Sequence, residues 1–104
     1  MVPKSIRSVL KKYKAALIEE GFPKFDMYLF GSYARGDERT DSDIDLCLVS
    51  DAFKSKKREY EKKAVFIAYH IDPRIQVVVT DPYKFKKDPL SPLFSRVRKE
   101  CIAA

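Results

Sequence analysis

The chain has 104 residues and a net charge of +6, and we expect residues 1–104 to form a single domain with one hydrophobic core. No apolar run approaches the roughly 20 residues that a membrane-spanning helix needs, and the N-terminal residues lack the apolar segment of a secretory signal. We therefore expect a cytoplasmic protein with no membrane partner. The positive charge favours polyanionic partners, either a nucleoside triphosphate or a nucleic acid, although lysine-rich surfaces also occur without them.

The first predicted elements are a helix and a strand. Over residues 2–20, apolar side chains recur at intervals of three and four residues, which indicates an amphipathic helix. Gly21 ends this helix, and Pro23 prevents its continuation. Residues 24–30 are rich in aromatic side chains and predict the first strand.

A Gly-Ser pair follows this strand directly. Gly31 permits a backbone conformation and a close approach that other residues resist, so we expect the pair to form a corner before a short helical turn. Backbone N–H groups and the Ser32 hydroxyl at such a corner can hold phosphate oxygens. Arg35 and Arg39 flank this position in the sequence, and they either contact a phosphate or are simply solvated.

A second strand is predicted over residues 43–49, and it begins with two acidic residues. Asp43 and Asp45 are two positions apart, so their side chains project from the same face of a strand. Two adjacent carboxylates repel one another unless a cation lies between them. Mg²⁺ is commonly bound through one or two carboxylates together with substrate phosphates. Asp43 and Asp45 therefore predict a magnesium site, with a merely polar strand face as the alternative.

The rest of the chain predicts two helices and a third strand. A helix over residues 53–71 has a densely charged first half, whose basic side chains either follow a nucleic-acid backbone or keep the helix soluble. The third strand covers residues 75–80, residues 84–88 are expected to be irregular, and a final helix runs from Ser91 through Ile102. Cys47 and Cys101 lack metal-ligand spacing, and we expect them to be reduced thiols.

The complete motif is more specific than its parts. Gly31-Ser32, then ten residues, then Asp43-Ile44-Asp45 resembles the nucleotidyltransferase superfamily of DNA polymerase β. The chain looks most like the small stand-alone domains called minimal nucleotidyltransferases. The fold expected for such a domain is α/β (α+β), with a small mixed sheet, helices packed on one face and the carboxylate face open.

The resemblance also implies a reaction and a set of site residues. Gly31 and Ser32 would hold the β- and γ-phosphates of a nucleoside triphosphate, with ATP as the expected nucleotide. Asp43 and Asp45 would hold Mg²⁺ against it, while an acceptor hydroxyl attacks the α-phosphate and displaces pyrophosphate.

One position departs from the superfamily pattern. A third acidic residue on the neighbouring strand usually completes the metal site and takes the proton from the attacking hydroxyl. Gln76 stands at that position here, and an amide binds metal weakly and is no general base at neutral pH. Three functions therefore stay open: a nucleotidyltransferase, a nucleotide-binding antitoxin or regulatory module that pairs with a helical HEPN-type partner, and a nucleic-acid-binding scaffold.

Overall fold

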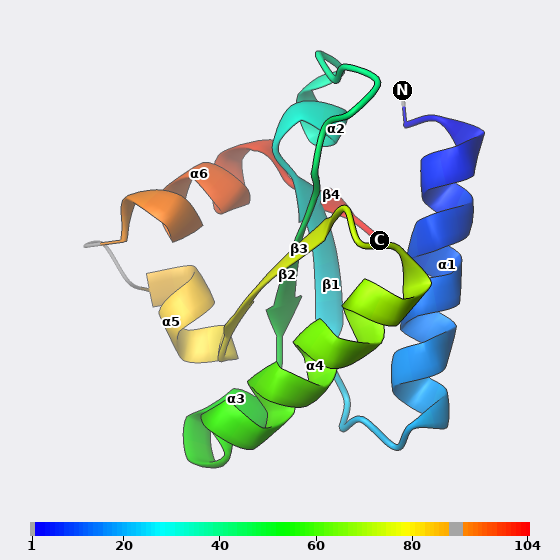
Figure 1. The fold of residues 1–104 in the computed structure, drawn as a ribbon. Helices are drawn as coiled ribbons and strands as arrows, with labels where there is room; N and C mark the ends of the chain where they lie inside the picture. The colour runs from blue at the N-terminus through cyan, green and yellow to red at the C-terminus, as the bar shows by residue number, and fades with distance from the viewer. Residues whose placement is uncertain (1, 88–90) are drawn as a thin grey trace.

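A central sheet with helices on both sides forms the framework of the protein (Figure 1). The computed structural model describes residues 2–87 and 91–104. In chain order, its elements are α1 (Lys4–Glu19), β1 (Asp26–Phe30), α2 (Ser32–Arg35), β2 (Ile44–Val49), α3 (Ala52–Ser55), α4 (Lys57–Ile71), β3 (Ile75–Thr80), α5 (Pro82–Lys87), α6 (Pro92–Glu100) and β4 (Ile102–Ala103).

The sheet is mixed and has the strand order β3-β2-β1-β4. β1 pairs antiparallel with both β2 and β4, whereas β2 pairs parallel with β3. The parallel pair needs a crossover connection, which α3 and α4 supply. The mixed α/β fold predicted from the sequence is confirmed.

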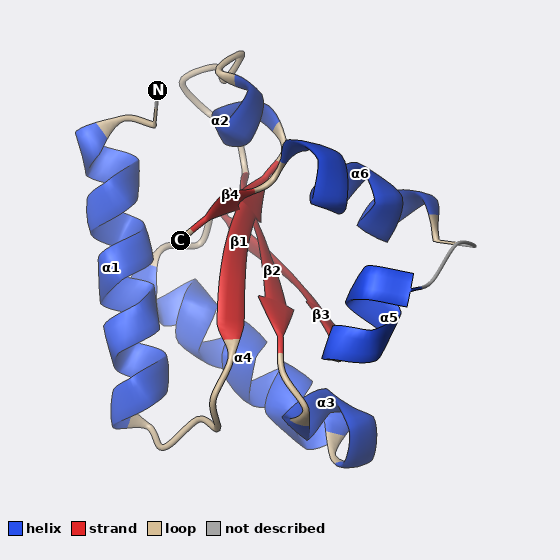
Figure 2. Ribbon diagram, turned by 180° about the vertical axis from the view of Figure 1, so that it is seen from behind, coloured by secondary structure: helices blue, strands red, loops and turns tan. Residues whose placement is uncertain are grey.

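The first face of the sheet carries the larger core. α1 and α4 cover this face, as Figures 1 and 2 show from opposite sides. Four apolar side chains of α1, spaced three or four residues apart, are buried, and side chains at alternate positions of the strands meet them. The buried members on these elements are Ile6, Leu10, Tyr13, Leu17, Met27, Leu29, Ile44, Leu46, Leu48, Ala64, Ala68, Ile75 and Val79.

The second face of the sheet is covered over part of its length, although the sequence predicted an open carboxylate face. A smaller cluster of buried residues, Phe30, Cys47, Val49, Phe85 and Val97, joins β1 and β2 to α5 and α6. β2 is therefore apolar on both sides, which is typical of strands that are buried on both faces. Within β2, Asp45 is the polar exception, and it is the second residue of the strand.

α5 and β4 were not predicted. Residues 84–87, which we expected to be irregular, belong to α5, while Asp88 and Pro89 lie outside the described residues. α5 forms because the Asp81 carboxylate accepts a hydrogen bond from the Lys84 N–H (2.9 Å) and Pro82 is the first helical residue. β4 has two residues and exists only because it pairs with β1.

Two further predictions are settled by the backbone. The helix expected over residues 53–71 is divided at Lys56, whose φ and ψ of −123° and 46° are not helical. The separate turn α3 buries Phe53 against Phe22.

The final helix begins as predicted at Ser91, whose hydroxyl accepts a hydrogen bond from the Phe94 N–H (3.2 Å). The final helix ends at Glu100 instead of continuing through Ile102.

Both cysteines are free thiols, in agreement with the prediction. Burial raises the pKa of Cys47 to about 12, so this thiol stays protonated within the second core. Within residues 2–87 and 91–104, no helix is long and apolar enough to cross a membrane.

Tyr13 connects the two helices of the first face, and this contact can be tested. Its hydroxyl is fully buried and donates a hydrogen bond to the Ala64 carbonyl of α4 (2.8 Å). Tyr13→Phe should lower the free energy of unfolding by about 1 kcal/mol, because the ring packing is kept and one hydrogen bond is lost. Tyr69→Phe on the exposed side of α4 is the control and should change nothing measurable in urea unfolding. Equal effects of the two substitutions would contradict this role of Tyr13.

Candidate functional site

The Gly-Ser corner has the geometry that the sequence predicts. β1 ends at Phe30, and Gly31 has φ 80° and ψ −155°, a conformation open almost only to glycine. A side chain at Gly31 would also overlap the Asp45 carboxylate. Gly31 therefore permits two things at once: the turn from β1 into α2, and the close approach of that turn to β2.

The two acidic residues lie beside this corner. Asp45 pairs with Phe30 in the antiparallel register of β1 and β2, and Asp43 immediately precedes β2. Strand alternation directs Asp45 to the second face together with Cys47, while Ile44 and Leu46 enter the first core. Asp43 is exposed and Asp45 is half-buried. The structure thus brings Gly31 and Asp45 into direct contact, with Asp43 at the same end of the sheet.

The environment of Asp45 disfavours its charged form. Burial raises the pKa of this carboxyl above its ordinary value, and the charges of Asp43 and Glu100 raise it further, against the opposing effect of Arg35. The pKa of Asp45 is thus higher in the folded than in the unfolded protein. At a pH above the folded-state pKa, the charged carboxylate therefore lowers the free energy of unfolding, and at a pH below the unfolded-state pKa this cost is absent. A cation at the carboxylates would remove this cost, which is what a metal site requires.

Gln76 lies next to Asp45 on the neighbouring strand. The two residues are paired in the parallel register of β2 and β3, so their side chains leave the sheet on the same face. Gln76 is exposed. The expected position of the third carboxylate is therefore occupied by an uncharged amide.

The acidic residues at the two ends of β3 have other partners. Asp72 forms an ion pair with Arg74 (2.8 Å), and the hydrogen bonds from this arginine lower the pKa of the Asp72 carboxyl. Asp81 is buried and caps α5. In the described residues, no group of three or more His, Cys, Asp or Glu side chains is placed to hold a metal ion.

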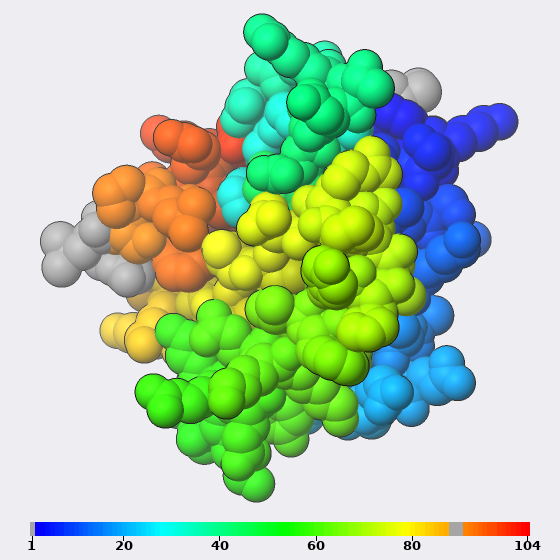
Figure 3. All heavy atoms as spheres, viewed as in Figure 1, coloured from blue at the N-terminus to red at the C-terminus, as the bar shows by residue number. Residues whose placement is uncertain are grey.

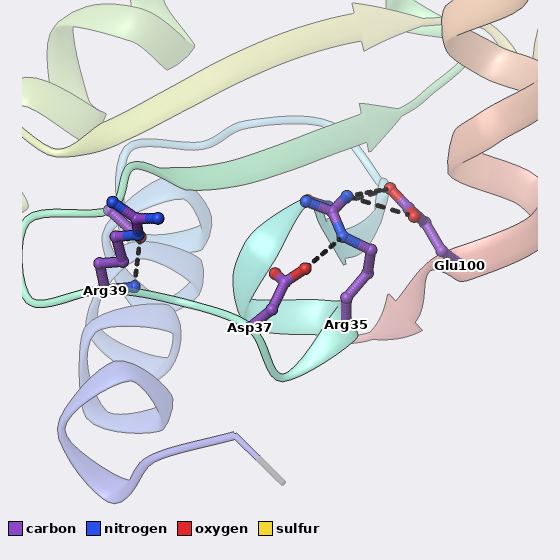
Figure 4. Close-up of polar contacts among 6 residues, drawn as sticks. Arg35, Asp37, Arg39 and Glu100 are labelled. Atoms are coloured by element: carbon purple, nitrogen blue, oxygen red, sulfur yellow. Dashed lines mark hydrogen bonds and ion pairs between the residues drawn. The ribbon is translucent and has the colours of Figure 1, made fainter.

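Arg35 lies at this corner, but its partners are carboxylates of the chain itself (Figure 4). Its Nε donates to Asp37 (3.2 Å), and its Nη1 donates to Glu100 at the end of α6 (3.2 and 3.4 Å). The Gly31 N–H also points to Glu100, at 3.4 Å from Oε1. Sequence reasoning missed Glu100, because it lies 69 positions from Gly31 and belongs to no motif.

Arg39 does not join this cluster. It lies in the loop between α2 and β2, apart from Arg35 and Glu100 (Figure 4), and its backbone N–H donates to the Ser42 hydroxyl (2.7 Å). This loop projects from one end of the molecule beside the corner (Figure 3). The carboxylate of Glu100 therefore joins Arg35, but not Arg39, to the Gly31 N–H group.

The basic residues of the predicted helix lie elsewhere. The charged stretch at the start of that helix forms α3 and the first turns of α4, at the end of the molecule opposite α2 (Figures 1 and 2). Lys54 pairs with Asp51 there, and the Lys63 ammonium donates to the Glu20 carbonyl. The basic stretch and the acidic corner are thus two separate surfaces.

The contact between Gly31 and Asp45 can be tested with a second glycine. Gly36 has the same φ of 80° but a left-handed helical ψ of 18°, and a Cβ there would meet nothing within 4 Å. Gly36→Ala should cost about 1–2 kcal/mol of stability, and Gly31→Ala about 1–3 kcal/mol more, because of the overlap with Asp45 and the rarer backbone conformation. Urea unfolding measures both.

An Asp45→Ala background separates these two causes. It should reduce the cost of Gly31→Ala, because the overlapping carboxylate is gone, and it should leave the cost of Gly36→Ala unchanged. If Gly31→Ala costs as much stability in that background as in the parent, overlap with the Asp45 carboxylate is not a reason for glycine at position 31.

Comparison with known proteins agrees with this geometry. Residues 10–102 match the nucleotidyltransferase domain family. A candidate nucleotidyltransferase from Sulfolobus solfataricus has a similar structure, with a TM-score of 0.50 and 25% identity over 99% of this chain and 87% of that one. One chain of a crystal structure of a toxin–antitoxin with AMP-PNP has a similar fold, with a TM-score of 0.56 and 20% identity over 88% of this chain and 69% of that one. No curated protein matches. With a family match over nearly its whole length, and a Gly-Ser corner set against an Asp-x-Asp strand, the chain belongs to the nucleotidyltransferase domain family.

Proposed function

We propose that this protein binds a magnesium–nucleoside triphosphate, with ATP as the nucleotide, at the corner between β1 and α2. It would transfer the nucleoside monophosphate to an acceptor hydroxyl and release pyrophosphate. One observation carries this proposal: the backbone of Gly31 lies directly against the Asp45 carboxylate. A backbone N–H that can donate hydrogen bonds to phosphate and a carboxylate that can bind a metal are therefore neighbours. Residues 1–104 would act as a single domain, in the cytoplasm.

The donor set fits magnesium that is shared with a nucleotide. Nucleotidyltransferase domains generally use a divalent metal. Asp43 and Asp45 offer two hard oxygen ligands, and the raised pKa of Asp45 reflects its burial and then the charge of Asp43, both of which a cation would offset. Two carboxylates leave most of the coordination positions to phosphate oxygens and water. The bound metal would neutralise charge on the triphosphate and polarise its phosphorus–oxygen bonds.

The residues of the chain would mainly bind and orient the nucleotide. The Gly31 N–H and the Ser32 hydroxyl would hold the β- and γ-phosphates at the start of α2, and Arg35 would supply positive charge beside them. Arg39 would reach the triphosphate from the adjacent loop. Positioning and charge neutralisation contribute most of the catalysis in reactions of this class.

Gln76 favours a second candidate function. It lies in register with Asp45, where a carboxylate would act as the general base, and its amide cannot take the proton from the acceptor. A protein that binds the nucleotide and turns over slowly is suited to a regulatory role, such as an antitoxin that pairs with a HEPN-type helical partner. The similar fold in a toxin–antitoxin with AMP-PNP supports this direction. A nucleic-acid scaffold has less support, because the basic stretch lies at the opposite end from the corner.

The metal site predicts a synergy between magnesium and ATP. Both together should raise the melting temperature more than the sum of their separate effects, by linkage. Saturation 100-fold above the dissociation constant stabilises by about 2.7 kcal/mol, which is roughly 10 °C for a domain of this size. The double variant Asp43→Asn/Asp45→Asn should lose the synergy.

A matched control removes two exposed charges elsewhere, in Asp26→Asn/Glu59→Gln. The control should keep the synergy that thermal melting detects in the parent. If the Asp43/Asp45 variant responds to magnesium and ATP as the parent does, the metal lies at another place.

Gln76→Asp separates a weak enzyme from a binding module. The added carboxylate should tighten magnesium binding and raise pyrophosphate release from ATP by about 100-fold, the lower end of the usual effect of a positioned general base. In the metal-free state the same substitution should lower stability, because a third carboxylate joins Asp43 and Asp45. Gln76→Asn is the control, since it shortens the side chain without adding charge.

Pyrophosphate release should be measured with a helical partner protein or an RNA as the acceptor. The parent should turn over slowly despite measurable nucleotide binding. A parent that turns over rapidly, and gains nothing from Gln76→Asp, would show that the reaction does not need a carboxylate at this position.

A further inference from the structure

The carboxylate of Glu100 occupies the donors that face the Gly-Ser corner. Its Oε1 lies 3.4 Å from the Gly31 nitrogen and 3.2 Å from Nη1 of Arg35, and its Oε2 lies 3.4 Å from the same Nη1 (Figure 4). The side chain is only 19% exposed, although it belongs to the last residue of a surface helix. The Gly31 N–H and the Arg35 guanidinium, here called the Gly31–Arg35 donor pair, therefore already hold an anion.

The chemistry of this donor pair suits phosphate equally well. A backbone N–H and a guanidinium bind carboxylate and phosphate oxygens through the same charge-assisted hydrogen bonds. A phosphate group and the Glu100 carboxylate cannot use the same hydrogens together, and their charges repel one another. Asp43 and Asp45 add negative charge at this end of the sheet, and Glu100 contributes to the raised pKa of Asp45.

We propose that Glu100 is an internal competitor of the triphosphate, which sets the nucleotide affinity of the site by occupying the Gly31–Arg35 donor pair. This inference rests on the proposed function, because it places nucleotide phosphates at Gly31. The side chain must leave the Gly31 N–H before a phosphate binds. Affinity for the triphosphate is then reduced by the fraction of molecules in which Glu100 holds the donors.

The backbone around Glu100 indicates that the side chain, and not the helix, makes this movement. Before it, Val97 is fully buried in the second core, and the Arg98 guanidinium donates to the Phe85 carbonyl of α5. After it, Ile102 pairs with Leu29 of β1. The chain on both sides of Glu100 is thus anchored to the rest of the fold, while the Glu100 carboxylate, among residues 2–87 and 91–104, is held by Gly31 and Arg35 alone.

The test is calorimetric titration with magnesium and α,β-methylene-ATP, in which the bond that transfer would break is replaced. Glu100→Gln should bind this nucleotide about three- to tenfold more tightly than the parent, because the competing charge is gone. Glu100→Asp should also bind more tightly, since its shorter side chain keeps the charge but falls short of Gly31. It provides an independent result if Glu100→Gln does not fold.

Two controls separate competition from a general charge effect. Glu59→Gln changes the net charge equally at an exposed site of α4 and should leave the affinity at the parent value. AMP lacks the β- and γ-phosphates, so its affinity should be the same for the parent and for Glu100→Gln. A gain with AMP equal to the gain with the triphosphate would overturn the competition.

The remaining outcomes distinguish this inference from the proposed function. If the parent and Glu100→Gln bind the triphosphate equally, Glu100 is no competitor, and the nucleotide site stands. If Glu100→Gln binds more weakly, and only when magnesium is present, Glu100 is a metal ligand and the inference is wrong. If neither protein binds the triphosphate or magnesium, the proposed nucleotide site is wrong, and the inference about Glu100 is wrong as well.

Discussion

The contact between the end of β1 and the beginning of β2 is the constraint on which the candidate site depends. Antiparallel pairing sets Phe30 opposite Asp45, so the turn after Phe30 must pass beside a carboxylate. A residue with a Cβ would overlap that carboxylate, and it would also be strained at φ 80°. Glycine at position 31 removes both conflicts. The backbone N–H groups at the start of α2 and the carboxylates of the Asp-x-Asp segment are neighbours for this reason.

Hydrophobic burial determines where the polar groups emerge. β2 is covered on both faces, by α1 and α4 on one side and by α5 and α6 on the other, so its middle tolerates only apolar side chains. Asp45 points to the same face as Cys47 and Val49, but it lies near the first residue of β2, outside the apolar cluster that α5 and α6 form with this face. The half-buried position that results raises the pKa of Asp45 and makes the carboxylate a good place for a cation.

Charge is distributed unevenly over the molecule. The chain carries a net charge of +6, yet three carboxylates, those of Asp43, Asp45 and Glu100, interact at one end of the sheet. The basic side chains of α3 and early α4 lie at the other end (Figure 1). Net charge is therefore a poor guide to this site, because the local balance is between the acidic cluster and Arg35. Any anionic ligand at the corner must change that balance, either with a cation or by displacing Glu100.

Local sequence patterns predict most of the individual elements and the central motif. The three main strands, α1 and the start of α6 follow from short-range patterns: the spacing of apolar side chains, strand alternation and capping residues. The Gly-Ser corner and the Asp-x-Asp segment were recognisable because their residue types and spacing resemble those of the nucleotidyltransferase superfamily. α5 has a local signal as well, in Asp81 and Pro82, but the same two residues also predict a turn with irregular structure after it.

The features that join distant parts of the chain follow from tertiary packing and not from any local pattern. β4 is two residues long and is a strand only because β1 lies beside it, so no local pattern announces it. The cover of the second face depends on Phe85 and Val97 meeting β1 and β2. Glu100 reaches Gly31 across 69 positions for the same reason, since packing of α6 and pairing of β4 hold it there. Local sequence encodes backbone preference, whereas contacts between such distant residues arise when the whole core is assembled.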